Sequence, residues 1–241
     1  MSRGPDGPGF HGRRKGHGLR AGRRRLVEAR LPGLRLSLPA EAEGPVDPKG
    51  FFTDPIEDLW LEIGFGAGEH LAEQARLNPR VGFLGCEPFV NGVASLVSLI
   101  DGAGLANVRI HDDQAEPLFA ALPDASVGRL FALFSDPWPK KRHWKRRLIR
   151  PENLRQFARI LKDRAEVRFA TDHLGYIRWT LEQIRRDGNF AWTARRPADW
   201  RERADDWPGT RYEKKARAEA RQCVYLRFQR RPRFGSDKQK T

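Results

Sequence analysis

Glycines and acidic side chains cluster where the first of several apolar runs ends. The run 58–63 leads into Glu62-Ile-Gly64-Phe-Gly66-Ala-Gly68-Glu69. Glycines let a turn bend tightly and let the backbone approach a ligand closely, which is how a strand, a turn and a helix bind a nucleotide. The acids bring negative charge to this turn. The pattern predicts a site for a nucleoside with a positive end and no phosphate, bound by Glu62, Gly64, Gly66 and Gly68.

Two common phosphate-binding patterns do not match this turn. Glu69 stands where the dinucleotide fingerprint G-x-G-x-x-G has its third glycine, which disfavours a nicotinamide oxidoreductase. The Gly-Lys-Ser/Thr sequence of a phosphate loop is also missing from the turn. S-adenosylmethionine has a positive sulfonium and no phosphate, and it is the ligand that the turn favours.

Carboxylates also follow the next two apolar runs. Glu87 follows the run 81–86, and an acid at the tip of this neighbouring strand is placed to bind both ribose hydroxyls. Asp113 follows the run 107–111, where it can accept a hydrogen bond from an adenine amino group, and Asp112 is the alternative. Acids at successive strand ends, together with the glycine turn, predict one shared cofactor site.

The next apolar run, 128–135, ends in a turn that could hold a substrate base. Its sequence is Phe134-Ser135-Asp136-Pro137-Trp138-Pro139-Lys140. In a doubly wound sheet this strand end lies beside the crevice where the strand order reverses. Methyl transfer to a planar nitrogen needs a polar anchor and a flat wall, and Asp136 and Trp138 provide them. We predict that Asp136 is the catalytic residue and also contacts the cofactor.

A run of basic and aromatic residues follows this turn directly. It contains Arg142, His143, Trp144, Lys145, Arg146 and Arg147. Cations suit RNA phosphates, and an aromatic ring can stack on a splayed base, so the run predicts an RNA-binding segment. A solvated helix face is the ordinary alternative for charged residues, but this run has one sign and adjoins the predicted active site.

The elements that must position these residues alternate from residue 58 onward. Strand-like runs occupy 58–63, 81–86, 107–111, 128–135, 165–170, 190–195 and 223–229. Helical spacing links Val90 to Val97 and Leu154 to Leu161. This alternation predicts an α/β fold with a doubly wound, mostly parallel, seven-stranded Rossmann-like sheet. Between the last two runs there is no strong helical pattern of the ordinary type, only the charged stretch 211–221, which favours an antiparallel last strand.

The ends of the chain differ in composition from this domain. We expect a disordered basic arm over 1–31, a Pro-rich lead-in over 32–57, a methyl-transferring domain over 58–231 and a polar tail over 232–241. The arm has too little apolar surface to offset the entropy of ordering it. RNA contact and a solubilising role are both open for it.

The charge of the whole chain indicates a polyanionic partner. It has 45 Lys and Arg against 31 Asp and Glu, a formal charge of +14, which attracts nucleic acid or an anionic membrane face. Its apolar stretches are too short for a membrane span or a signal peptide, so we expect a cytoplasmic protein without membrane contact. Cys86 and Cys223 belong to no ligand cluster, which predicts buried thiols and no metal site.

These motifs together resemble the bacterial family of tRNA (guanine-N7)-methyltransferases, from about Leu59 to Phe228. The most specific segments are EIGFGAGE (62–69), FSDPWPKKRHWKRRLI (134–149), ATD (170–172) and TRYEKKA (210–216). The resemblance implies S-adenosylmethionine contacts at Glu62, Glu87, Asp113 and Asp136. It implies substrate contacts at Lys140, Asp172, Thr210, Arg211, Tyr212 and Glu213, and RNA contact across 142–147. Ser135 departs from the family, which usually has Pro there.

The resemblance also implies a reaction, which is methylation of N7 of guanosine 46 in the variable loop of tRNA. We expect a monomer or a homodimer, a choice that the sequence leaves open. N7 carries a free lone pair, so the reaction needs alignment and charge stabilisation and no general base. The alternatives are the same catalyst acting on another base or nucleic acid, and an RNA-binding protein with a defunct cofactor site. The intact acids at 62, 87, 113 and 136 disfavour the second.

Overall fold

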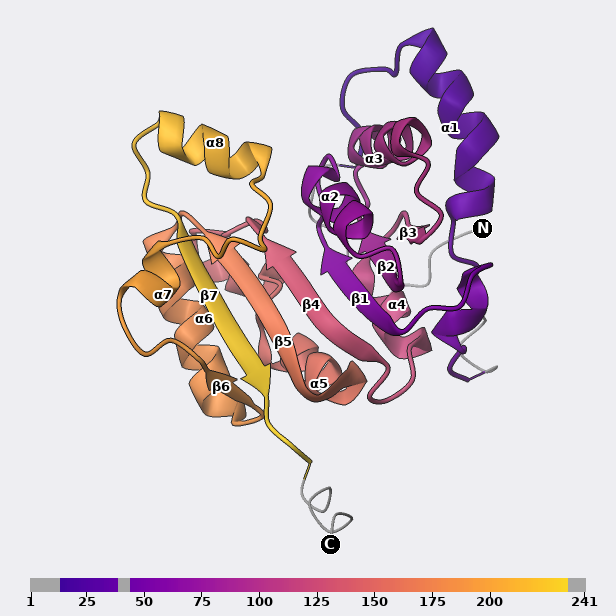
Figure 1. Ribbon diagram of the computed structural model, residues 1–241. Coiled ribbons are helices and arrows are strands. Elements are labelled where there is room, and N and C mark those ends of the chain that lie inside the picture. The colour runs from indigo at the N-terminus through magenta and orange to yellow at the C-terminus, as the bar shows by residue number, and fades with distance from the viewer. Residues whose placement is uncertain (1–13, 39–43, 234–241) are drawn as a thin grey trace, which may run out of the picture.

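The strands of the protein form a single mixed sheet in the computed structural model, which describes residues 14–38 and 44–233 (Figure 1). The strand order is β3-β2-β1-β4-β5-β7-β6. The strands are β1 (Asp58–Ile63), β2 (Val81–Cys86), β3 (Val108–His111), β4 (Val127–Leu133), β5 (Leu161–Thr171), β6 (Phe190–Trp192) and β7 (Val224–Arg230). β7 pairs antiparallel with β5 and β6, whereas β1 to β5 pair in parallel. The predicted fold class is therefore confirmed.

Helices cover both faces of this sheet because each has an apolar stripe to bury. α1 (Ala21–Leu34), α2 (Glu69–Leu77) and α3 (Val90–Ala103) share one core cluster with β2 and β3. α4 (Ala115–Ala121), α5 (Pro151–Ile160) and α6 (Leu174–Asp187) share a second core cluster. The short helices α7 (Ala198–Arg201) and α8 (Arg211–Ala218) and the 3-10 turns η2 (Pro48–Phe51) and η3 (Lys141–Arg146) complete the described elements. Cys86 and Cys223 are buried thiols, as predicted.

Helix α1 corrects the prediction of a disordered arm over 1–31. Val27, Leu31 and Leu34 lie four and three residues apart and so form one helical stripe. Leu31 and Leu34 are buried in the core cluster that includes α3, and Arg30 pairs with Asp101 of α3 at 2.9 Å. Burial of these leucines offsets the entropy lost when the segment becomes ordered. From the basic composition we expected that entropy to keep the segment disordered. Residues 1–13 of the predicted arm lie outside the described residues.

The predicted lead-in over 32–57 also contains defined structure. Its first residues end α1, and Leu36 N–H then donates to the Ile110 carbonyl at 2.8 Å, beside the edge strand β3. Phe52 and Ile56 are buried in the core cluster that includes β1. None of the helices in the described part of the chain is long and apolar enough to cross a membrane. Most of the predicted tail, 234–241, lies outside the described residues.

The carboxyl ends of the parallel strands meet at one edge of the sheet. β1 is flanked by β2 on one side and β4 on the other, so the order of strands reverses beside it. In open α/β sheets the crevice outside such a reversal is where ligands bind. The loops that follow β1, β2, β3 and β4 carry the glycine turn, Glu87, Asp113 and Asp136, and the fold thus brings them to a single edge.

Candidate active site

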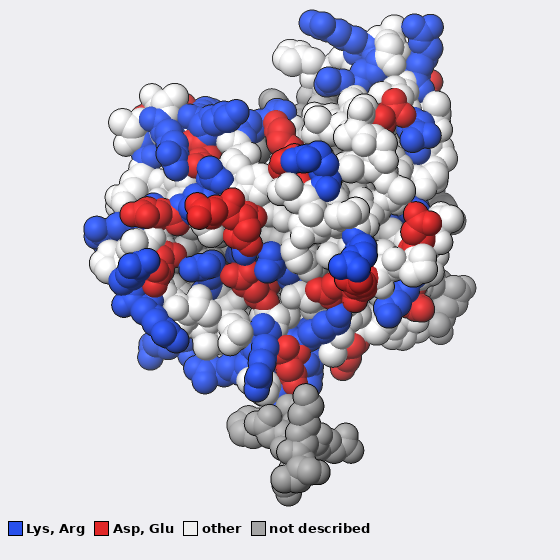
Figure 2. Space-filling view, in the orientation of Figure 1, with Lys and Arg blue, Asp and Glu red and all other residues white. Residues whose placement is uncertain are grey.

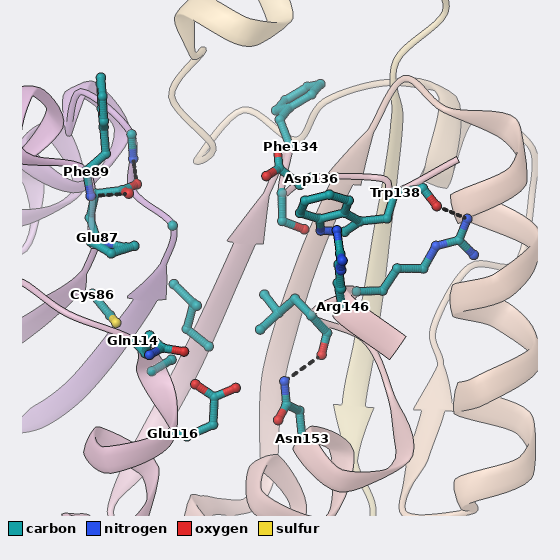
Figure 3. A pocket seen from close by; sticks show the side chains of 18 of the residues that line it. Cys86, Glu87, Phe89, Gln114, Glu116, Phe134, Asp136, Trp138, Arg146 and Asn153 are labelled. Atoms are coloured by element: carbon teal, nitrogen blue, oxygen red, sulfur yellow. Dashed lines mark hydrogen bonds between the residues drawn. The ribbon is translucent and has the colours of Figure 1, made fainter. Parts of the chain in front are cut away.

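A cavity of about 730 Å³ opens at this edge of the sheet (Figure 3). Figure 3 shows Glu87 and Phe89 on one side and Asp136 and Trp138 on the other. Five segments that are far apart in the sequence line it, namely the glycine turn, the loops after β2, β3 and β4, and the stretch around η3, with one ring from α8. The lining includes Ile63, Gly64, Gly66, Cys86, Gln114, Ala115, Glu116, Lys145, Arg146, Arg147, Leu148, Arg150, Asn153 and Tyr212.

The glycine turn has the backbone that its sequence predicts. Gly64, Gly66 and Gly68 have φ angles of 72°, 58° and 82°, in the left-handed region that side chains rarely adopt. An ideal Cβ at Gly92 of α3 would lie 2.1 Å from the Gly66 carbonyl oxygen, so α3 packs directly on the turn. Sequence reasoning missed Gly92, because the residue that packs against a glycine cannot be inferred from the position of that glycine in the chain.

Glu87 is fixed against this turn by backbone donors. Its Oε2 accepts from Gly66 N–H at 2.9 Å, and its Oε1 accepts from Phe89 N–H at 3.0 Å. Burial raises the pKa of Glu87, and these two N–H groups offset part of that rise. Each carboxylate oxygen keeps a second acceptor site, so Glu87 can bind two hydroxyls while it stays in place.

Glu62 lies inside the turn and not on the cavity wall. It is buried, and its Oε2 is 2.7 Å from Nδ1 of His70, a buried residue of α2. The His70 ring packs edge-on against Phe131, with the ring centroids 4.8 Å apart. His70 is a residue that sequence reasoning missed, although its place in the first turn of the helix after the glycines was a usable signal.

The acids after β3 are bound by arginines from the N-terminal segment. Arg14 Nη2 contacts Asp113 Oδ1 at 2.5 Å, and Arg35 donates to both oxygens of Asp112 at 2.9 and 2.6 Å. Burial raises the pKa of Asp113, but the Gln114 N–H and Arg14 outweigh it, so the pKa is lowered. The side chain of Asp113 is 52% exposed. The cavity wall at this strand end consists of Gln114, Ala115 and Glu116, so a cofactor contact of Asp113 stays a prediction.

The turn after β4 brings Asp136 and Trp138 to the cavity. Phe134 and Trp138 have φ angles of 52° and 41°, which is uncommon for large side chains. Asp136 lines the cavity, and the protein around its carboxylate displaces enough water to raise its pKa. The Trp138 ring is flanked by His143, 5.7 Å away edge-on, and by the Arg146 guanidinium at 5.0 Å. Asp136 and Trp138 thus both line the cavity, and their roles as anchor and flat wall stay predictions.

The basic run divides into exposed and buried members. Arg142 and Lys145 are exposed, and Lys145 and Arg146 reach the cavity lining. Arg147 is only 1% exposed, and its Nε donates to the Pro137 carbonyl at 2.8 Å. This burial disfavours a contact of Arg147 with RNA, which stays a prediction. Aromatic side chains from α6 cover this arginine, and they lie too far along the chain for the local pattern to show them.

The substrate residues implied by the resemblance are only partly brought together. Tyr212 lines the cavity, and an ideal Cβ at Gly66 would lie 3.0 Å from its ring. Thr210 caps α8 by accepting from Glu213 N–H at 3.1 Å, and Glu213 is buried with Arg203 at 3.2 Å and Arg217 at 2.8 Å. The other three stand outside the lining: Arg211 pairs with Glu69, Asp172 pairs with Arg221 and Lys140 is exposed.

The donor set of the cavity fits S-adenosylmethionine. Gly64 and Gly66 leave room where side chains would fill the wall beside β1. Glu87, Glu116 and Asp136 supply carboxylates for hydroxyl, amino and sulfonium groups. The basic side chains Lys145, Arg146, Arg147 and Arg150 line the cavity from the segment after β4, away from the glycine turn that would hold a phosphate.

The chain is similar to a known enzyme family over most of its length. A family described as "Putative methyltransferase" matches residues 57–226. A tRNA (guanine-N(7)-)-methyltransferase of Rhodospirillum rubrum is 51% identical over 225 residues, which cover 93% of this chain and 88% of the relative. A protein of the same name from Chelativorans sp. is 47% identical over 92% of this chain and 94% of the relative.

Solved structures show the same fold at much lower sequence identity. The 16S rRNA (adenine(1408)-N(1))-methyltransferase from Catenulisporales acidiphilia has a TM-score of 0.56 and 13% identity, covering 83% of this chain and 97% of the other. The 16S rRNA methyltransferase KamB has a TM-score of 0.53 and 17% identity, covering 73% and 89%. These structures establish a class I methyltransferase fold. On its sequence and its cavity, the chain belongs to the family of tRNA (guanine-N(7)-)-methyltransferases.

Proposed function

We propose that the protein transfers a methyl group from S-adenosylmethionine to N7 of a guanosine in tRNA, at position 46 of the variable loop. The curated relatives carry tRNA guanine-N7 methylation in their names. The observation that carries the proposal is the pairing of Asp136 with the Trp138 ring, across the cavity from Glu87. A negative charge beside a flat wall suits a base that becomes cationic as it is methylated.

The cofactor half of the cavity divides its contacts among the strand ends. Glu87 would accept from both ribose hydroxyls while Gly66 N–H and Phe89 N–H hold it still. Gly64 and Gly66 would let the ligand approach the backbone, and Glu62, oriented by His70, would act from behind the turn. Gln114 and Asp113 would meet the adenine. Bound S-adenosylmethionine supplies an electrophilic methyl carbon.

The substrate half needs to align guanine and stabilise its developing charge. Guanine N7 attacks with its own lone pair, so no side chain has to remove a proton. Asp136 would lower the barrier because its charge is worth most once the ring is positive. Trp138 would hold the base plane, and closing the cavity around both groups would exclude water. This chemistry asks for no metal ion.

The remaining substrate residues have two kinds of role in this proposal. Thr210 and Glu213 would act from inside the protein by holding α8, which sets Tyr212 against the glycine turn. Asp172 and Arg211 are held in ion pairs that a base or a phosphate could replace. Lys140 is exposed beside the Asp136 turn and would contact the tRNA backbone.

Basic side chains around the cavity suit a folded RNA that is wider than the site. Arg142 and Lys145 are exposed beside it. Figure 2 shows Lys and Arg gathered over α8 and over α1, which flank the carboxyl edge of the sheet. The exposed members on α1 are Arg23, Arg24, Arg25 and Arg30. We assign these surfaces to tRNA phosphates, with a monomer as the smallest unit that contains the whole cavity.

A product-mapping experiment tests the proposal. The purified protein is incubated with methyl-labelled S-adenosylmethionine and an unmodified tRNA transcript, and the modified nucleotide is located. We expect a single 7-methylguanosine at position 46 and no label in a transcript with adenosine there. Label at another base would show that the substrate assignment is wrong. Tight binding of S-adenosylhomocysteine and tRNA without transfer would instead favour an RNA-binding protein with an inactive site.

A further inference from the structure

Arg147 is the buried exception in a run of exposed cations. Arg147 packs against the Asp136 turn at the cavity wall and the residue is only 1% exposed, whereas Arg142 and Lys145 face solvent. Among the described residues no carboxylate pairs with it. A buried cation without a counter-charge is costly unless other groups replace its water. Its surroundings therefore indicate what it is for.

The groups that replace this water belong to the turn and to three aromatic rings. Arg147 Nε donates to the Pro137 carbonyl at 2.8 Å, and Nη2 donates to the Trp138 carbonyl at 3.3 Å. The guanidinium carbon lies 4.8, 5.1 and 5.2 Å from the ring centroids of Trp144, Tyr176 and Trp179. Cation–π contact of this kind strengthens when the cation is removed from water.

We propose that Arg147 is a positioning residue for methyl transfer, which fixes the Asp136 turn by binding its two carbonyls from inside an aromatic cage. The inference rests on the role proposed for Asp136. It gives the last member of the basic run a task that differs from that of its neighbours. Arg142 and Lys145 bind the tRNA backbone, while Arg147 sets the geometry of the acid and the ring that meet the base.

The backbone of the turn explains why it needs such a clamp. Phe134 and Trp138 both have positive φ, a conformation that persists only when the surroundings impose it. A guanidinium has a rigid fork of donors and can bind two successive carbonyls at once. A lysine ammonium at the same place has three donors but no rigid fork, so it fixes the two carbonyls less firmly. The fork therefore fixes the direction of the peptide that joins Pro137 to Trp138.

The aromatic cage reaches the other end of the same turn. Tyr176, whose ring Arg147 covers, places its hydroxyl 3.4 Å from Ser135 Oγ and 3.3 Å from the Ile149 backbone N. Ser135 directly precedes Asp136, so one cage contacts the residues on both sides of the acid. Burial lowers the pKa of Arg147, which is the expected result of holding a charge away from water.

Variants of Arg147 and of its exposed neighbour separate positioning from RNA binding. We expect Arg147→Lys to lower the single-turnover rate at saturating tRNA and cofactor about 10-fold, and Arg147→Met about 100-fold, as for lost charged hydrogen bonds. The salt dependence of tRNA binding and the affinity for S-adenosylhomocysteine should stay at the parent values. Arg142→Met should instead flatten the salt slope of tRNA binding. A flatter slope in both Arg147 variants would overturn the inference.

A double-mutant cycle tests whether Arg147 acts through Asp136. Asp136→Asn should slow the parent strongly and slow the Arg147→Lys protein much less, because the acid is already misplaced there. Equal effects in the two backgrounds would show that Arg147 acts independently. If Asp136→Asn leaves the parent rate intact, the catalytic role of Asp136 fails first, whatever Arg147 does. Retained affinity for S-adenosylhomocysteine shows that a variant is folded. If Arg147→Met loses this affinity, the inference is tested with Arg147→Lys alone.

Discussion

Gly92 lies against the carbonyl oxygen of Gly66 so closely that an ideal Cβ at Gly92 would stand 2.1 Å from it. Gly92→Ala must therefore push α3 and the glycine turn apart, which should disturb the hydrogen bond from Gly66 N–H to Glu87, just before α3. We expect overpacking to destabilise the fold by about 1–3 kcal/mol and to lower the affinity for S-adenosylhomocysteine, because the contact between Gly66 and Glu87 is displaced. Isothermal titration calorimetry measures this affinity.

The same helix provides a control for this substitution. Gly102, near the other end of α3, has open space around its Cβ position. Gly102→Ala should leave the affinity unchanged and stabilise the fold by about 0.5–1 kcal/mol through helix propensity. If Gly92→Ala binds the ligand as well as Gly102→Ala does, the packing of α3 does not set the shape of the turn.

Asp136→Asn should act on the rate and hardly on binding. The substitution keeps the shape of the side chain and removes the charge that faces the cavity. We expect single-turnover kcat to fall about 10²–10³-fold, comparable to losing one preorganised electrostatic contact. The Kd for tRNA should change little. A near-parent rate with both ligands saturating would mean that alignment alone drives the transfer.

The pH dependence of kcat/KM should also report Asp136. Burial raises its pKa, so the acid is neutralised at a higher pH than an ordinary aspartate, whose pKa is about 3.9. Activity should fall as pH drops through this raised pKa, because the neutral acid no longer stabilises the cationic base. The pKa of Glu87 is raised as well, so Glu87 could also cause a fall in kcat/KM at low pH. The part of this fall that Asp136→Asn abolishes is the part due to Asp136. An unchanged fall at low pH in that variant would assign it to Glu87 instead.

The exposed basic run should give tRNA binding its salt dependence. Arg142→Gln removes one exposed cation next to the cavity. We expect the slope of log K against log salt to flatten by roughly 0.7–0.9 for one lost phosphate contact. Arg185→Gln, exposed near the end of α6, serves as the control and should keep the parent slope. Equal slopes for the two variants would place the phosphate contacts elsewhere.

The sheet and the chemistry at its strand ends were predictable because both follow from short local patterns. β1 and β2 begin and end at the residues that their apolar runs predicted, 58–63 and 81–86. Glu87 comes directly after β2 and Asp136 comes three residues after the end of β4, and parallel strands bring such positions to one edge. The sequence alone was enough to place both acids at this cavity.

The missed features depend on partners that are distant in the chain. Arg147 looked like its exposed neighbours, because Tyr176 and Trp179 that enclose it stand about 30 residues later. Helix α1 was hidden by its basic composition, although Leu31 and Leu34 already had helical spacing. Composition averages over a segment, whereas burial is decided by a few side chains on one face.

The pairing of Leu36 with Ile110 has a further consequence, for how the protein avoids self-association. β3 is the last strand on its side of the sheet, and Leu36 N–H occupies the Ile110 carbonyl there. A bare strand edge can recruit another chain by backbone hydrogen bonding. The opposite edge strand, β6, has only three residues. A truncation that removes α1 together with Leu36 would uncover β3, so loss of activity in such a protein would report aggregation as well as lost RNA contact.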